Sequence, residues 1–330
     1  RLKYIFKQLC TRILGIPVSF TNSVDEFVAH DSLKMSYTTQ PLGNEIFVRS
    51  HPILFEQGLS DVEIKVQDWE DNKCFFHVGE KSSIPFDIFS ASFYLLSRYE
   101  EYLPHVKDEY GRFSANDSIA FKYGFLNQPV VDIWAYKFKR LLAQKYPGHQ
   151  FTERQFNVDP VIDVPMAYYF KNKGLIRTIG GMLNVFVRFK VVQLYRRFTV
   201  LFGLKEDPHN TFDWIIETQK TYKRKFKIFF LIGDYSTYDK NISINKKAFV
   251  SLIKSVADYC KVGLKASYFA LEEFDILKRE KKNMESIINT SLELSRNSFS
   301  KLNLPHCYRN LVELEINEDY TICLLYTSPS

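Results

Sequence analysis

Residues 226–233 read FKIFFLIG, and this nearly continuous apolar run decides the fold. A run of this kind predicts a strand that is covered on both faces of a parallel sheet. Residues 248–260 follow with Phe249 and Val256 on one side, which predicts an amphipathic helix, and residues 261–266 predict a short strand. Strand, helix and strand in succession are typical of parallel β/α units rather than of hairpins.

The same alternation extends over the second half of the chain. There we expect a first strand at 155–164, one long or broken helix at 271–294 and another helix at 306–314. The first half instead mixes short alternating runs with helical periodicity, which predicts strands at 45–49 and 62–66, one helix between Pro85 and Pro104, a helix at 131–144 and a linker at 145–154. The predicted fold class is α/β, with a mixed α+β domain at 1–150 followed by a second domain at 151–323.

Composition excludes several classes of protein. The chain has 330 residues, of which 45% are hydrophobic and 25% charged, and this mixture is sufficient for a buried core. The net charge of +6 is modest and spread along the chain, so nucleic-acid binding is not expected. The most apolar region, residues 182–204, is interrupted by four Arg and Lys residues, which excludes a transmembrane helix. Five scattered cysteines and the lack of a visible signal peptide favour the reducing cytoplasm.

The basic and apolar stretch at residues 185–201 allows two interpretations. An amphipathic helix of this kind lies on a membrane surface, or it packs on the rest of the protein by its aromatic face. Since packing needs no further partner, we favour the packed helix.

In parallel sheets, functional groups lie at the carboxyl ends of the strands, where the following loops meet. Three places qualify here: Asp163, Gly233 with Asp234, and residues 265–268. An acid at a strand end serves as a base, as a ligand or only as a helix cap, and for a lone aspartate the cap is the favoured reading. Position alone therefore does not identify a site.

Other polar residues have structural explanations. Asp207, Thr211 and Asp213 resemble the start of a helix, where such side chains accept hydrogen bonds from the first N–H groups. His209 and His306 lie on different predicted elements and are expected to be surface or cap residues. Cys260 and Cys307 are expected to be thiols of the core.

Two long stretches of the first half carry a family resemblance. Residues 85–113 read PFDIFSASFYLLSRYEEYLPHVKDEYGRF and residues 118–134 read SIAFKYGFLNQPVVDIW. This part resembles the uncharacterised amino-terminal domain that precedes a NodB-type polysaccharide deacetylase domain in bacterial proteins, often from Bacteroidetes. The resemblance continues in the second half with VIDVPMAYYFKNKG at 161–174, FFLIGDYSTYDKN at 229–241, VGLKASY at 262–268 and SRNSFSKLNLPHCYRNL at 295–311.

The resemblance implies an incomplete (β/α) barrel of NodB-like deacetylase type that follows an accessory domain. In that family, one aspartate and two histidines hold a divalent metal such as zinc. The metal polarises an N-acetyl carbonyl and activates water, while a neighbouring aspartate acts as the base. The implied reaction is the N-deacetylation of a polysaccharide, and the implied partner is a carbohydrate polymer.

Carried over residue by residue, the resemblance predicts that the metal site is lost. Asp163 keeps the position of the base, whereas Pro165 stands where the family has its metal-binding aspartate. Lys265 replaces the first histidine and Ser298 replaces the second. Because this set lacks the charge and the donor atoms that a divalent ion needs, we expect no metal or other cofactor. Lys265 either forms an ion pair with Asp163 that fills the vacated position, or is a solvated loop residue.

We therefore expect a degenerate polysaccharide deacetylase-like protein, weakly active or inactive as an enzyme. A deacetylase that works with altered ligands would need further histidines or acids near Asp163. The alternative from another class is a non-catalytic carbohydrate-binding or scaffold protein that uses Tyr168, Tyr235 and Tyr268 as stacking platforms. The resemblance stops at about residue 322, before a Gly-Phe-Arg-Ala-Gly motif of the family, so the barrel is expected to be truncated. We interpret residues 324–330, which read LLYTSPS, as a non-native tail.

Overall fold

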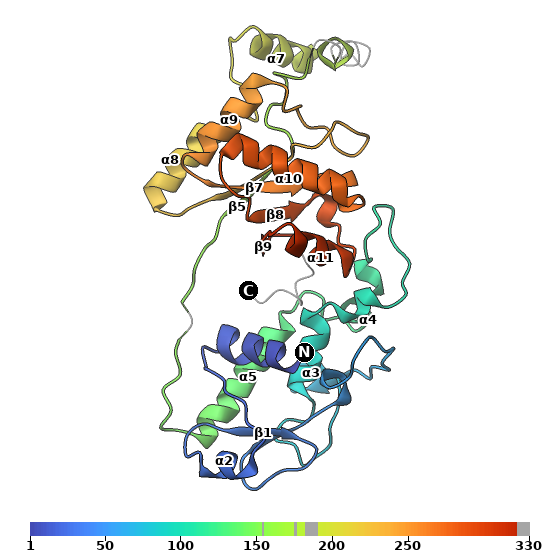
Figure 1. Cartoon of the computed structure of the whole chain (residues 1–330), viewed down its shortest axis with the longest axis vertical. Helices are drawn as coiled ribbons and strands as arrows, with labels where there is room; N and C mark the ends of the chain where they lie inside the picture. The colour runs from blue at the N-terminus through green and yellow to red at the C-terminus, as the bar shows by residue number, and fades with distance from the viewer. Residues whose placement is uncertain (154, 175–176, 182–190, 322–330) are drawn as a thin grey trace. The chain divides into compact units, whose positions relative to one another are not determined.

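The structure is a computed structural model that describes residues 1–153, 155–174, 177–181 and 191–321 (Figure 1). The chain divides into two compact units, Arg1–Phe156 and Asn157–Ile322. The expected tail at 324–330 lies outside the described residues. In the described part of the chain, none of the helices is long and apolar enough to cross a membrane.

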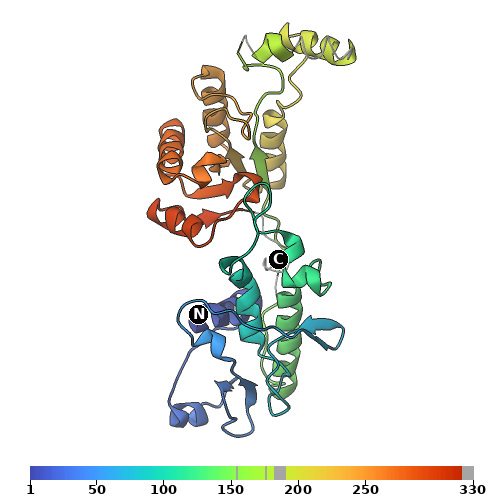
Figure 2. The ribbon, with the colours of Figure 1, turned by 90° about the vertical axis from the view of Figure 1, so that its right-hand side faces the viewer.

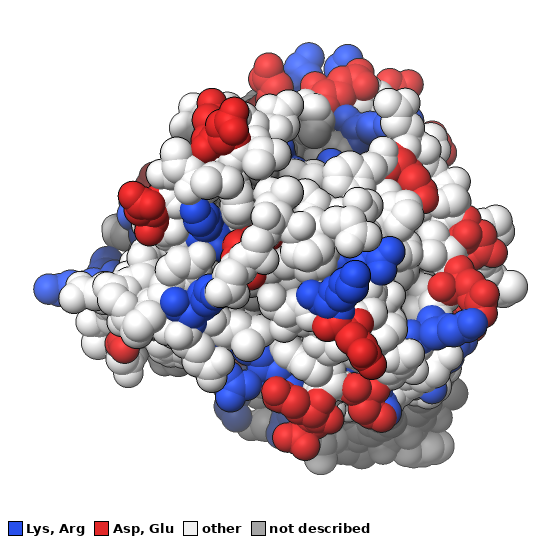
Figure 3. All heavy atoms as spheres, turned by 90° about the horizontal axis from the view of Figure 1, so that it is seen from below, with Lys and Arg blue, Asp and Glu red and all other residues white. Residues whose placement is uncertain are grey.

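The first unit is built from short strands and helices around an aromatic core. β1 (Met35–Thr38) pairs in parallel with β2 (Ile46–Arg49), and β3 (Gln67–Trp69) pairs in antiparallel with β4 (Asn72–Cys74). The α-helices are α1 (Leu2–Phe6), α2 (Val24–Ala29), α3 (Ile88–Leu96), α4 (Ile119–Lys122) and α5 (Val130–Lys145), and π-helical turns over Lys7–Ile13 extend α1. The largest buried side chains of this unit include Trp134, Phe75, Phe86, Phe89 and Phe138. On the face of the molecule in Figure 3, acidic and basic side chains are intermixed, in line with the small net charge.

Helix α3 is shorter than the sequence predicts. It begins after Asp87, whose carboxylate accepts hydrogen bonds of 3.0 Å from the N–H groups of Phe89 and Ser90. The helix ends because Arg98 has a left-handed backbone with φ of 56°, after which only a short 3-10 turn covers Tyr99–Tyr102. The expected single helix between Pro85 and Pro104 is therefore wrong in its second half.

The strand predicted at 45–49 and the helix predicted at 131–144 are confirmed as β2 and α5. The strand predicted at 62–66 is wrong. Its apolar residues Val62, Ile64 and Val66 do pack against the core, but the segment has no ladder partner among the described residues. The alternating apolar residues therefore indicate that one side of this segment is buried. Burial of one side does not require pairing with a neighbouring strand.

The second unit contains a five-stranded parallel sheet in the order β5-β6-β7-β8-β9. Its strands are β5 (Val161–Val164), β6 (Lys227–Phe230), β7 (Lys261–Ala266), β8 (Leu294–Asn297) and β9 (Glu318–Asp319). Its α-helices are α7 (Val191–Leu201), α8 (Phe212–Tyr222), α9 (Lys247–Ala257), α10 (Phe274–Ile288) and α11 (His306–Glu313). The sheet is open, with β5 and β9 at its edges, and no barrel closes among the residues that the structure describes (Figure 2).

The register of the strands brings charged side chains to one face of this sheet. Asp163 of β5 is aligned with Phe229 of β6 and with Gly263 of β7, while Lys265 of β7 is aligned with Arg296 of β8. Aligned residues point to the same side of a sheet, and so do residues two apart along a strand. All five residues therefore lie on one face, which we call the polar face.

The opposite face, called here the helix face, carries the apolar core. Residues of the strands, among them Ile228, Phe230 and Leu264, form one cluster with apolar residues of four helices: Phe212 and Ile216 of α8, Phe249 and Ile253 of α9, Leu277 and Met284 of α10, and Leu311 of α11. These four helices thus contribute apolar residues to one core. Strand β6 was expected to be covered on both sides, and Phe229 is indeed buried on the polar face, where it lies over Gly263.

The parallel β/α alternation of the second half is confirmed, with corrections to two elements. The first strand covers only Val161–Val164 of the predicted 155–164. The helix predicted at 271–294 is wrong at its end, because α10 stops at Asn289, which has a left-handed backbone with φ of 56°. Leu294 then begins β8, a strand that the sequence did not predict.

Candidate functional site

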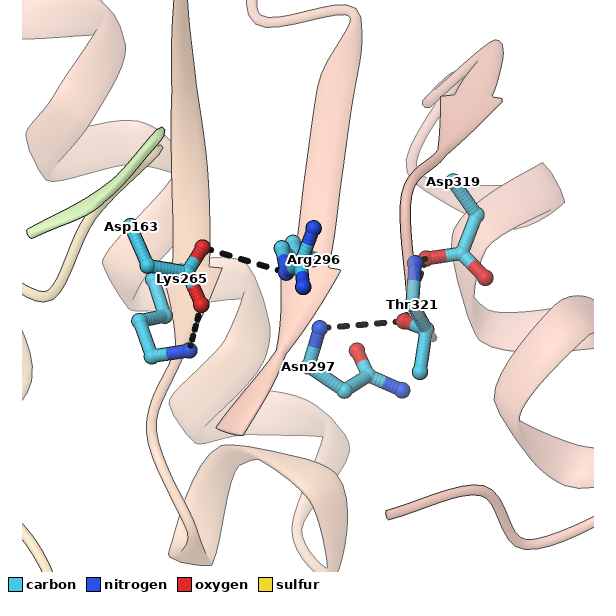
Figure 4. A network of polar contacts seen from close by, with 6 residues as sticks. All are labelled: Asp163, Lys265, Arg296, Asn297, Asp319 and Thr321. Carbon is cyan, nitrogen blue, oxygen red and sulfur yellow. Dashed lines mark hydrogen bonds and ion pairs between the residues drawn. The ribbon is translucent and has the colours of Figure 1, made fainter. Parts of the chain in front are cut away.

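Three charged side chains meet on the polar face where the strands end (Figure 4). The Nζ atom of Lys265 lies 2.8 Å from Oδ2 of Asp163. The Nε atom of Arg296 lies 3.1 Å from the other oxygen, Oδ1. Asp163 is therefore bound by a cation on each carboxylate oxygen. We call these three residues the ion cluster.

The ion cluster is partly shielded from water. The side chain of Lys265 is 11% exposed and that of Arg296 is 15% exposed, while Asp163 remains 30% exposed. Lys265 lies within β7, so the interpretation of a solvated loop residue is wrong and the predicted ion pair with Asp163 is present. Arg296 was not predicted as a site residue, although it stands two residues before Ser298 in the stretch 295–311.

The ion cluster does not fit a divalent metal. An ammonium and a guanidinium occupy the two oxygens of the carboxylate, and the side chain of Pro165, after β5, has no donor atom. Across the described ranges, no group of three or more His, Cys, Asp or Glu residues is placed to hold an ion. At about 4 Å, two unit charges repel by roughly 4 kcal/mol at an effective dielectric constant of 20, and a divalent ion doubles this cost.

Ser298 lies at the end of β8, beyond Arg296, and its hydroxyl is buried without a hydrogen-bond partner among the residues that the structure describes. The neighbouring Asn297 is held from two sides. Its backbone N–H donates to Oγ1 of Thr321 at 3.0 Å, and its side-chain amide donates to the carbonyl of Lys301 at 2.8 Å. Figure 4 shows that Asn297 and Thr321 tie the end of β8 to the chain beyond β9.

Tyr268 follows β7 but its ring is enclosed. It is 7% exposed and stacks on Tyr238 with ring centroids 3.8 Å apart. The Nζ atom of Lys301 lies 4.1 Å from the centre of the same ring, and Lys301 is itself paired with Glu272 at 2.7 Å. This enclosure leaves little of Tyr268 for stacking on a sugar, whereas Tyr238 is partly exposed.

Tyr235 is the exposed ring of the predicted set. The guanidinium of Arg177 lies 4.1 Å from its centre and Nζ of Lys240 lies 4.9 Å from it. Tyr235 also lines a cavity of about 70 Å³ together with Gly233 and Glu280. Tyr168 packs against the core of the helix face and is only partly exposed.

Two buried acids support the loop after β7, and sequence reasoning missed both. Glu280 of α10 accepts hydrogen bonds from the N–H and the hydroxyl of Ser267, and Asp239 accepts one from the N–H of Tyr268 at 2.9 Å. Burial raises the pKa of Glu280 to about 7, against the two hydrogen bonds from Ser267, which lower it. Burial likewise raises the pKa of Asp239.

A signal for Glu280 was present in the sequence. It stands in the apolar stripe of α10 between Leu277 and Met284, where an acid is out of place. Gly233 shows how closely the elements approach, because a Cβ atom there would lie 2.4 Å from Oε1 of Glu280 and 2.6 Å from Cβ of Ser267. Gly233, the last residue of the apolar run at 226–233, therefore leaves space for the buried carboxyl group of Glu280.

Asp207 does not cap a helix. Helix α8 begins after Thr211, which makes no side-chain cap hydrogen bond, so the predicted helix start at 207–213 is wrong for Asp207. Its buried carboxylate instead accepts hydrogen bonds from the backbone N–H groups of residues 169, 170, 171 and 209. Burial acts to raise the pKa of Asp207, but these four donors outweigh it and hold the pKa below its ordinary value.

The remaining candidates are structural. His209 contacts the carbonyl of Met166 through Nδ1 at 3.0 Å, and His306 is the first residue of α11. Cys260 is buried in the core of the helix face. Cys307 packs against that core and accepts a hydrogen bond from the side-chain amide of Asn297.

Comparison with known proteins finds a family model and similarity to solved structures. Residues 1–147 match the model of a family described as a family of unknown function, DUF7033. Among solved structures, the chain is similar to a mutant of a CE4 family pseudoenzyme with restored enzymatic activity, at 15% identity and a TM-score of 0.26. That similarity covers 33% of this chain and 38% of the length of the solved chain. No curated protein matches the sequence.

Proposed function

We propose that the second unit is a polysaccharide deacetylase-like domain in which the ion cluster stands where the family holds its metal, and that it acts by binding rather than by hydrolysis. The motifs quoted above support the family assignment. The consecutive order of five parallel strands, with helices packed on one face, supports an arc of a (β/α) barrel. One observation carries the proposal: Lys265 lies 2.8 Å from the carboxylate of Asp163.

The chemistry of the ion cluster argues against metal-dependent deacetylation. In the family reaction the metal supplies a Lewis acid and activates a bound water. An ammonium or a guanidinium has no vacant orbital and cannot bind a water oxygen in that way. Asp163 also engages both oxygens with Lys265 and Arg296, so it is poorly placed to take a proton from water.

The test combines metal analysis with an assay of acetate release. The purified full chain is incubated with zinc, its bound metal is measured, and it is then supplied with N-acetylated oligosaccharides. We expect less than one equivalent of metal and no acetate above the level of an Asp163→Asn variant. A stoichiometric metal that is lost in Asp163→Asn, or acetate release that this variant abolishes, would contradict the proposal.

A carbohydrate polymer is the ligand that the resemblance implies, and the exposed ring of Tyr235 beside Arg177 and Lys240 supports this second candidate. An aromatic ring provides a stacking surface, and neighbouring cations pair with acidic sugars. Titration with neutral and with acidic oligosaccharides measures the affinity. Tyr235→Ala is expected to weaken it, and Tyr222→Ala, at an exposed ring of α8, serves as the matched control. An equal affinity in both variants would exclude Tyr235 as the platform.

A further inference from the structure

Helix α7 lies in a segment with an unusual charge distribution. Residues 164–205 contain eight Lys or Arg residues and no Asp or Glu. The structure describes α7 as Val191–Leu201, and both views place it beyond α9, apart from the sheet (Figures 1 and 2). The helix therefore carries excess positive charge at one end of the second unit.

The outward side of α7 is aromatic. Val192, Tyr195, Phe198 and Phe202 recur every three or four residues and so share one side of the helix. Tyr195 is 62% exposed, Phe198 is 40% exposed and Phe202, just after the helix, is 75% exposed. The rings of Phe198 and Phe202 stack with centroids 6.1 Å apart.

The inward side of α7 is formed by other residues, since Arg197 and Val200 are buried. The interpretation favoured from the sequence, in which the helix packs by its aromatic face, is therefore wrong for the residues that the structure describes. Val200 is buried, whereas Tyr195, Phe198 and Phe202 are exposed.

Two cations lie beside this aromatic side, and the first acid that follows them in the sequence is Glu206. Arg196 is exposed within the helix, and Nζ of Lys205 lies 5.9 Å from the ring of Tyr195. Burial and the charges of Arg177 and Arg197 lower the pKa of Lys173, while the charge of Asp207 acts to raise it. Charge complementarity therefore calls for a polyanionic partner.

We infer that α7 docks this chain on an anionic lipid bilayer, with Val192, Tyr195, Phe198 and Phe202 inserted at the level of the headgroups. Arg196 and Lys205 then meet lipid phosphates, while the aromatic rings occupy the interface between headgroups and acyl chains. A soluble polyanion would use the two cations but would leave the apolar stripe in water. This inference is independent of the function proposed for the ion cluster.

The inference is tested by co-sedimentation of the full chain with vesicles. Vesicles of phosphatidylcholine alone are compared with vesicles that also contain phosphatidylglycerol, and we expect binding on the order of tenfold tighter to the mixed vesicles. The double variant Phe198→Ser/Phe202→Ser is expected to lose most of the binding, and Arg196→Glu to weaken it severalfold. The double variant Trp214→Ser/Tyr222→Ser removes two exposed rings from α8 and serves as the matched control, with binding unchanged.

A second measurement reports insertion directly. Tyr195→Trp places an indole in the aromatic side, and its emission is expected to shift to the blue and to be quenched by brominated lipids. Thermal unfolding checks that each variant is folded. Four results would overturn the inference: no binding to either vesicle, equal binding to both, equal losses in the control, or binding that depends on Arg196 but not on the phenylalanines. The last result would indicate that the partner is a soluble polyanion. If the chain bound no vesicles but self-associated, and the phenylalanine variant lost this self-association, the partner would be a second copy of the chain.

Discussion

The ion cluster makes a quantitative prediction for a double-mutant cycle of Lys265→Met and Asp163→Asn. At the observed 2.8 Å, the gross attraction of two unit charges is about 6 kcal/mol at an effective dielectric constant of 20. The cost of removing the two charged groups from water offsets most of this attraction. Because Lys265 is mostly shielded while Asp163 is 30% exposed, we expect a coupling free energy of about 1–2 kcal/mol, between the values for exposed and for buried pairs.

Urea unfolding of the wild type, both single variants and the double variant gives the coupling. The pair of Arg279 and Asp234 is the matched control in the same unit, because its distance of 2.9 Å is similar but its side chains are 57% and 91% exposed. We expect a coupling there of less than about 0.5 kcal/mol. If the two cycles gave equal couplings, the ion cluster would be an ordinary surface contact and the reasoning about its role would fail.

Three further predictions concern other residues of the second unit. Burial raises the pKa of Glu280 from 4.5 to about 7, so the folded chain binds a proton that the unfolded chain has released. The free energy of unfolding should then fall by as much as about 3 kcal/mol as the pH rises from about 4.5 through 7. In urea titrations, Glu280→Gln should remove this dependence on pH. The same dependence on pH in the wild type and in the variant would contradict the prediction. Asp207→Asn should cost at least about 2 kcal/mol by the same assay, since an amide cannot accept all four N–H groups, and a loss below about 0.5 kcal/mol would refute this role. Gly263→Ala places a Cβ atom 2.5 Å from the ring of Phe229 and should cost about 1–3 kcal/mol, visible as a lower melting temperature; an unchanged temperature would mean that the ring moves freely.

The core of the second unit could be predicted from the sequence because its signals are local. Strand β6 and helix α9 differ sharply in apolar periodicity, and β7 follows directly. Strand β8 could not be found in this way. Its residues Ser295, Arg296 and Asn297 are polar: Arg296 belongs to the ion cluster, and the side-chain amide of Asn297 donates to Lys301 and Cys307. A strand whose side chains serve polar contacts has no apolar alternation to detect.

Part of the site could be predicted because the carboxyl ends of parallel strands lie at the same edge of a sheet. The resemblance identified Asp163 and Lys265, and parallel pairing brings the ends of β5 and β7 within reach of one side chain. Arg296 and Glu280 required knowledge of the register and of which side of α10 is buried. Neither follows from spacing along the chain, because the contact of Arg296 with Asp163 joins residues on strands that are not neighbours in the sheet.

Under the function proposed above, the ion cluster would account for a carboxylate at Asp163 beside Lys265 and Arg296. A divalent ion next to Asp163 would bring two positive charges, and Lys265 with Arg296 bring the same number. Removing the metal without these cations would leave a partly shielded carboxylate uncompensated, which is costly in a half-buried site. Under the proposed function, the two cations would therefore preserve the electrostatic balance of the strand ends in place of a metal. On this argument Lys265→His alone should lose stability without gaining a metal, because Arg296 still holds one oxygen of Asp163. Measured zinc affinity and urea unfolding of that variant would decide the matter, and tight zinc binding would show that Arg296 alone does not block the site.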